Sequence, residues 1–166
     1  MGLVVNRGDF IGKFGITQKK PILNGSSTVD GLDDFINDYE EELLVELFGM
    51  EMYNEFKLNP TDPIYTPIFN PLTSYIGKYS RGLKDMLVKF IYVEYNRLNY
   101  VNTSLGQQKS KGETTERYDS SVSLMNMTTY NEAVNSFNVI LEYLGKNRDV
   151  FTKFKPLIFR KKMMIL

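Results

Sequence analysis

Two segments with a helical repeat of apolar residues, separated by a polar stretch, constrain the fold of this chain more than any other feature. In the segments 80–102 and 130–144, apolar residues recur at spacings of three and four. This spacing gathers apolar side chains on one face of an α-helix. A third segment, 33–48, has the same repeat, and the glycine after it is suited to end a helix. We therefore predict a mainly α protein, a small helical bundle of three principal helices.

Short helices and extended appendages are expected around this bundle. Residues 1–29 contain five glycines and no helical repeat, which predicts an extended N-terminal arm. Short helices are predicted at 50–56 and 148–154, whereas the four prolines of 58–72 argue against regular helix there. Residues 156–166 mix apolar and basic side chains, which suggests a strand or a docking tail. The arm either covers the core of its own subunit or lies on a neighbouring one, and the sequence leaves both open.

The polar stretch 104–121 joins the two strongest helical segments, and we predict that it forms a polar loop. Its three basic residues, Lys109, Lys111 and Arg117, are balanced by three acidic ones. One interpretation is a mobile loop in solvent. Loops longer than about 12–15 residues are uncommon unless they have a function, so a functional loop is the alternative.

The absence of both cysteine and histidine excludes several kinds of chemistry. There is no thiolate nucleophile, no disulfide framework and no imidazole to act as a general base or metal ligand. Carboxylate or lysine chemistry remains possible. Twenty basic residues balance twenty acidic ones, so no overall charge favours nucleic acid or an anionic membrane. No segment approaches the ~20 apolar residues of a membrane span, and the start does not resemble a signal peptide, so we expect a soluble, unsecreted chain.

The charges are distributed unevenly along the chain. The segment 30–55 contains ten acidic residues and no lysine or arginine, whereas 153–166 contains five basic residues and no acidic one. The acidic run could hold a divalent cation or supply an acid and a base. A solvated helix face is the ordinary alternative for such a run.

Aromatic residues offer two further candidate surfaces. Tyr65 and Phe69, in the proline-rich loop, either form a peptide-docking surface or cover one end of the bundle. Tyr92, Tyr95 and Tyr100 could stack on nucleobases, but no basic stripe accompanies them to hold phosphates. Packing in a core or an interface is the favoured interpretation of these tyrosines.

The order of four segments resembles the head-to-tail connector proteins of tailed bacteriophages, which are adaptor or head-completion subunits. These segments are DFIGKFGIT, DFINDYEEELLVELFGMEMYNEF, GLKDMLVKFIYVEYNRLN and, after the polar insertion, TYNEAVNSFNVILEYLGKNRDVF. The resemblance implies a helical connector domain over 30–155, between the arm and the tail. It also implies a homo-oligomeric ring, commonly twelvefold, that joins the portal protein to the next tail component.

The same resemblance implies that genomic DNA passes through the ring without sequence-specific binding. It implies a place in the neck of the virion after assembly in the host cytoplasm, with no catalytic residue, no cofactor, no metal and no membrane. We expect contacts with a neighbouring subunit or partner at ten residues. These are Phe10, Phe14, Glu41, Glu42, Lys109, Lys111, Arg117, Arg160, Lys161 and Lys162.

The uneven charge distribution suggests how such subunits would meet. In a ring, one surface of a subunit must complement a different surface of the next. An acidic first helix facing the basic arm or tail of a neighbour would satisfy this requirement and would make assembly sensitive to salt. Two other classes of function remain as alternatives: a small cellular helical binding or regulatory module, and a carboxylate-dependent enzyme.

Overall fold

The computed structural model describes residues 2–16, 32–74, 76–106 and 115–157. Five α-helices, three short 3₁₀ helices and one two-stranded sheet make up this part of the chain. In chain order they are η1 (Arg7–Asp9), η2 (Gly12–Phe14), α1 (Leu32–Phe48), α2 (Met50–Leu58), η3 (Pro63–Tyr65), α3 (Thr66–Phe69), β1 (Leu72–Thr73), β2 (Tyr79–Ser80), α4 (Leu83–Gly106) and α5 (Thr115–Lys146). The predicted mainly α fold is confirmed, and α1, α4 and α5 are its principal helices.

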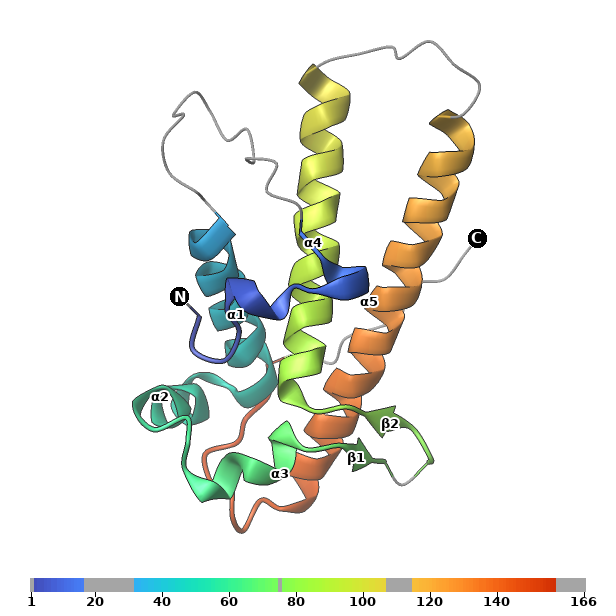
Figure 1. The fold of residues 1–166 in the computed structure, drawn as a ribbon. Helices are drawn as coiled ribbons and strands as arrows, with labels where there is room; N and C mark the ends of the chain where they lie inside the picture. Colours follow the sequence, from blue (N-terminus) through green and yellow to red (C-terminus); the bar gives the residue numbers. More distant parts are fainter. Residues whose placement is uncertain (1, 17–31, 75, 107–114, 158–166) are drawn as a thin grey trace.

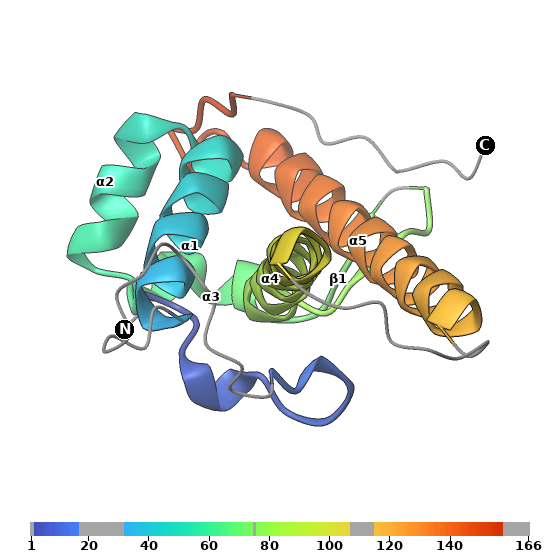
Figure 2. The same cartoon turned by 90° about the horizontal axis from the view of Figure 1, so that it is seen from above.

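The helices α4 and α5 form an antiparallel pair, and α1 packs beside α4 (Figure 1). Seen from above, α1 and α5 lie on opposite sides of α4 (Figure 2). The antiparallel strands β1 and β2 pair Leu72 with Ser80 and pack against α5. The hairpin and α3 lie at one end of the bundle, where α4 begins and α5 ends (Figure 1).

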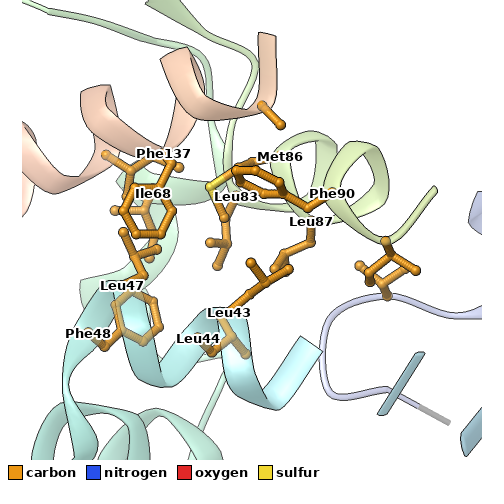
Figure 3. Close-up of a cluster of buried hydrophobic side chains, with 14 of the residues drawn as sticks. Leu43, Leu44, Leu47, Phe48, Ile68, Leu83, Met86, Leu87, Phe90 and Phe137 are labelled. Atoms are coloured by element: carbon orange, nitrogen blue, oxygen red, sulfur yellow. The ribbon is translucent and has the colours of Figure 1, made fainter. Parts of the chain in front are cut away.

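The core lies where the apolar faces of these helices meet. Leu43 and Leu47 of α1, Phe90 of α4 and Phe137 of α5 are almost entirely buried (Figure 3). The rings of Phe90 and Phe137 meet edge to face, with centroids 6.3 Å apart. Burying a side chain of this kind is worth about 1.5–3 kcal/mol, so the three-and-four repeat of the sequence supplies the main stabilisation of the bundle.

The end of α1 is closed by a glycine and by the C-terminal segment. Gly49 has a φ of 79°, and a Cβ there would lie 2.1 Å from the carbonyl oxygen of Lys155. The backbone N–H of Lys155 donates to the carbonyl of Phe48, and that of Leu157 donates to the carbonyl of Glu46, both at 3.1 Å. The predicted glycine cap is confirmed, and the C-terminal segment satisfies carbonyls at the helix end.

The predicted loop 104–121 was too long at both ends. The helix α4 continues to Gly106, and α5 already begins at Thr115. Residues 107–114 lie outside the described residues. The prediction relied on apolar repeats, which polar helical turns lack, although residues such as glutamate and arginine favour helix on their own.

Two further predictions of local structure were wrong. The proline-rich loop contains helical turns, because Pro63 and Pro67 occupy the first turns of η3 and α3, where a missing N–H costs nothing. The segment 148–154 forms turns and no helix. Tyr65 is buried and its ring packs 4.9 Å from that of Phe56, which supports packing as the role of this aromatic residue.

The described part of the N-terminal arm folds over the core of its own chain. It crosses α1 and α4 in Figure 1. Val5 and Phe10 are buried in the core, and Phe14 packs edge to face against Tyr92 at 5.4 Å. The first of the two interpretations of the arm therefore holds for residues 2–16.

Candidate functional site

A polar pocket of about 230 Å³ lies between the arm, the hairpin and the two long helices. We call it the basic pocket. Its lining comes from four separate parts of the chain: η2, β2 and the residue after it, α4, and α5. The lining residues are Lys13, Tyr79, Arg81, Lys89, Glu132, Asn135 and Ser136.

Lys89 is the buried, ion-paired lysine of this pocket. It is 4% exposed, and its Nζ pairs with Asp85 at 2.8 Å and with Glu132 at 3.0 Å. The lysine thus links α4 to α5 across their interface. Burial alone would raise the pKa of Glu132, but the hydrogen bond and charge of Lys89, together with Lys13 and Arg81, lower it below its ordinary value.

The rim of the pocket carries the remaining positive charge. Lys13 and Arg81 are exposed, and neither forms an ion pair with another described residue. The Nζ of Lys13 lies 4.8 Å from the centre of the Phe14 ring. Three cations face two carboxylates here, those of Asp85 and Glu132, which leaves one net positive charge. The pocket is therefore suited to attract an anionic group.

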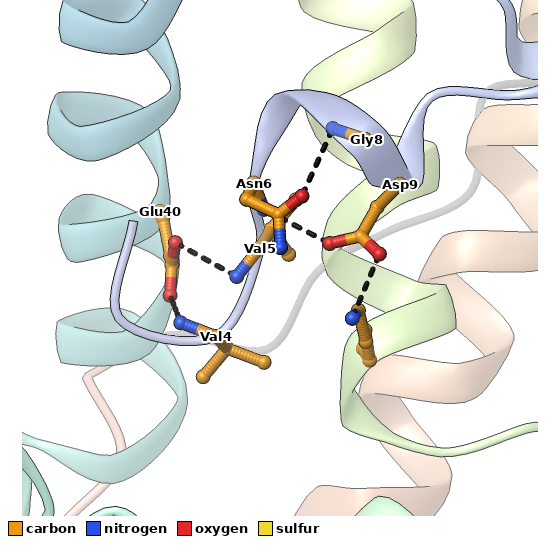
Figure 4. A network of polar contacts seen from close by, with 7 residues as sticks. Val4, Val5, Asn6, Gly8, Asp9 and Glu40 are labelled. Carbon is orange, nitrogen blue, oxygen red and sulfur yellow. Dashed lines mark hydrogen bonds and ion pairs between the residues drawn. The ribbon is translucent and has the colours of Figure 1, made fainter. Parts of the chain in front are cut away.

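A second pocket, of about 360 Å³, lies between the start of the arm, α1 and α2. Its central group is the carboxylate of Glu40, which is 1% exposed. The backbone N–H groups of Val4 and Val5 donate to its two oxygens, at 2.6 and 3.3 Å (Figure 4). Burial raises the pKa of Glu40, and these backbone hydrogen bonds oppose the rise. Because each oxygen accepts a backbone hydrogen bond, this carboxylate fastens the start of the arm to α1.

The other acidic residues of α1 and α2 divide into paired and unpaired groups. Asp33 pairs with Arg7 at 3.4 Å, and Glu41 pairs with Lys57 at 3.6 Å. Within the described ranges, no group of three histidine, cysteine, aspartate or glutamate residues is placed to hold a metal ion. The solvated-face interpretation therefore describes most of the acidic run, and Glu40 is the exception.

The described basic residues near the C-terminus, Lys153 and Lys155, pair with acids of the same chain. Lys153 pairs with Glu55, and Lys155 pairs with Glu51 at 3.2 Å. These contacts hold the C-terminal segment against α2. Lys153 and Lys155, the first two basic residues of the segment 153–166, are thus matched by acids of their own chain.

The ten predicted contact residues fall into three groups. Phe10 is buried, which leaves it little surface for a partner, whereas Phe14 is half-buried beside the basic pocket. Glu41 and Glu42 are exposed on α1, and Arg117 lies in the first turn of α5. The remaining residues, Lys109, Lys111, Arg160, Lys161 and Lys162, lie outside the described residues.

The sequence prediction missed the basic pocket and the buried carboxylate. The pocket unites residues far apart in the chain, so no local pattern reveals it. Glu40 did carry a signal, because it lies four residues after Ile36 and three before Leu43, within the apolar repeat of α1. A charged residue at such a position is expected to be buried with a partner.

None of the described helices combines the length and apolar character needed to cross a bilayer. Comparison of the chain with protein-family models, with curated proteins and with solved structures gave no significant match.

Proposed function

We propose that this chain is a structural virion protein, a subunit of a ring-shaped head-to-tail connector that joins the portal to the tail of a bacteriophage. The observation that carries the proposal is the length of the α4–α5 pair relative to the rest of the bundle. The sequence resemblance to connector subunits supports the same function, and the twelvefold symmetry of the ring is part of the proposal.

The long pair extends well beyond the helix that packs beside it. With 24 and 32 residues, α4 and α5 span about 36 and 48 Å, whereas the 17 residues of α1 span about 26 Å. Figure 1 shows both long helices rising above α1. Such an extension adds little to the core of a monomer, but it suits a subunit whose neighbours pack alongside it.

Apolar residues on α5 support this interpretation. Leu124 and Met125 are 54% and 39% exposed. They lie in the half of α5 that is nearer to its start, away from the core contacts of Phe137. Single exposed apolar residues are ordinary, but adjacent ones on a projecting helix are typical of a surface that a partner covers.

The charge balance fits a DNA channel that does not grip its contents. Tight binding of phosphates requires a surplus of lysine and arginine, and the chain has equal numbers of basic and acidic residues. A ring of such subunits would let DNA pass without sequence-specific contacts.

The test is assembly on a portal. The purified chain, alone and mixed with the portal protein encoded with it, is examined by size-exclusion chromatography with light scattering and by electron microscopy. We expect ring-shaped particles, either of the chain alone or on the portal. A stable monomer or dimer that neither forms rings nor binds the portal would overturn the proposal and favour a regulatory module.

A further inference from the structure

We propose that the basic pocket is one half of a contact between subunits, and that it receives an acidic stripe on α1 of a second copy of this chain. The acidic stripe consists of Asp34, Asp38 and Glu42. This inference rests on the proposed ring and specifies which surfaces meet in it.

The stripe is the part of the acidic run that remains unmatched within the subunit. Its three residues are exposed and form no ion pair with another described residue. Other acids nearby do have such partners, namely Asp33, Glu41, Glu51 and Glu55. Spacings of four residues place the stripe along one side of the helix, over about 12 Å.

The basic pocket offers the complementary charge. Lys13 and Arg81 stand exposed at its rim, and the charge of Lys89 beneath them is already matched by Asp85 and Glu132. An incoming carboxylate would therefore meet the rim cations first. Arginine in particular can bind a carboxylate through two parallel hydrogen bonds.

The two surfaces are formed by different elements of the molecule. Figure 2 shows α1 and α5 on opposite sides of α4, and the arm runs from beside α1 past α4. The basic pocket is lined by α5, α4, β2 and η2, and α1 does not line it. A contact between two different surfaces of identical subunits is heterologous, and its repetition closes a ring when the rotation between neighbours permits. The chain thus presents, on different elements, two complementary surfaces of the kind that a ring contact requires.

A second copy is favoured over nucleic acid because the anionic partner is already present on the chain. DNA binding also needs a broad basic surface, whereas this pocket holds one net positive charge. Duplex DNA is therefore the competing ligand of the basic pocket that the experiment must exclude.

The test exchanges the charges of the two proposed surfaces and measures assembly of the full chain in the presence of the portal protein. Arg81→Glu and Asp38→Lys are made singly and together, and Arg148→Glu serves as the control, because Arg148 is exposed and lies outside the pocket. Circular dichroism and thermal melting verify that each variant folds. Ring yield is measured by sedimentation velocity at low and high salt.

We expect each pocket or stripe variant to reduce ring yield at low salt by about tenfold or more, and the double variant to recover most of it. The control should match the wild type. If the wild type forms rings and Arg81→Glu forms them equally well, the inference is wrong while the proposed function stands. If the wild type forms no ring even with the portal, both are wrong. DNA binding is measured by the fluorescence of a labelled short duplex. The inference is overturned, and the pocket assigned to nucleic acid, if both single variants lose ring yield, the double variant does not recover it, and Arg81→Glu abolishes binding of the duplex.

Discussion

Glu40, in the middle of α1, accepts a hydrogen bond of 2.6 Å from the backbone N–H of Val4, which lies 36 residues earlier in the chain. The same carboxylate accepts a second hydrogen bond from Val5. One buried side chain therefore holds the start of the arm against the bundle. The arm in turn places Lys13 at the rim of the basic pocket. The hydrogen bonds of Glu40 therefore help to position one residue of the proposed contact surface.

Replacing Glu40 with alanine should destabilise the fold. The substitution leaves the N–H groups of Val4 and Val5 without their acceptor, and an unsatisfied buried donor costs about 1–3 kcal/mol. Urea unfolding measures the change in the free energy of unfolding. The matched control is Glu42→Ala on the exposed side of the same helix, which should change stability by less than about 0.5 kcal/mol. Equal effects of the two substitutions would contradict the role assigned to Glu40.

The raised pKa of Glu40 predicts a pH dependence of stability. Burial makes the folded protein hold this proton more tightly than the unfolded chain, despite the hydrogen bonds from Val4 and Val5. The stabilisation is therefore complete below the unfolded pKa, near 4.5, and is lost as pH rises through the folded value. Urea midpoints of the wild type, compared with Glu40→Gln, should fall relative to that variant as pH increases above 4.5. Parallel curves for the two proteins would refute this prediction.

The principal helices were predictable from the sequence because the repeat that forms each helix also forms the core. Ile36 and Leu43 belong to one such repeat, and Phe137 belongs to another. The capping of α1 by Lys155 was not predictable, because it joins residues more than 100 positions apart and has no local pattern. The basic pocket was missed for the same reason, since Arg81 and its other lining residues meet only in the folded chain.

Substituting Gly49 with alanine should cost more stability than the same change at another glycine with a similar φ angle. Gly49 and Gly77 have φ values of 79° and 77°, so both substitutions carry the cost of a left-handed backbone, about 1–2 kcal/mol. Only at Gly49 would the new Cβ meet the carbonyl of Lys155, whereas nothing lies within 4 Å at Gly77. Thermal melts should show a clearly larger loss for Gly49→Ala. Similar losses would mean that the C-terminal segment does not press on this position.

Removing the charge of Lys89 should disturb both stability and the titration of Glu132. Lys89→Met keeps most of the buried stem but leaves Asp85 and Glu132 without their shared cation. Loss of one partner of a buried ion pair costs about 3–5 kcal/mol, and because both carboxylates are partly exposed we expect a smaller loss, about 1–3 kcal/mol.

The control for this substitution is Lys84→Met, on the same helix as Lys89. It removes a more exposed ion pair, the one between Lys84 and Asp9. It should cost about 1 kcal/mol or less. Because Lys89 lowers the pKa of Glu132, Lys89→Met should raise that pKa, and NMR titration of the glutamate side chains measures the change. In the wild type, the lowered pKa of Glu132 means that its carboxylate stabilises the fold at pH values above the pKa of the unfolded chain. This stabilisation is lost as pH falls, so Lys89→Met should lose stability less steeply on acidification. An unchanged Glu132 titration would show that Lys89 does not govern the charge of the basic pocket, whatever its effect on stability.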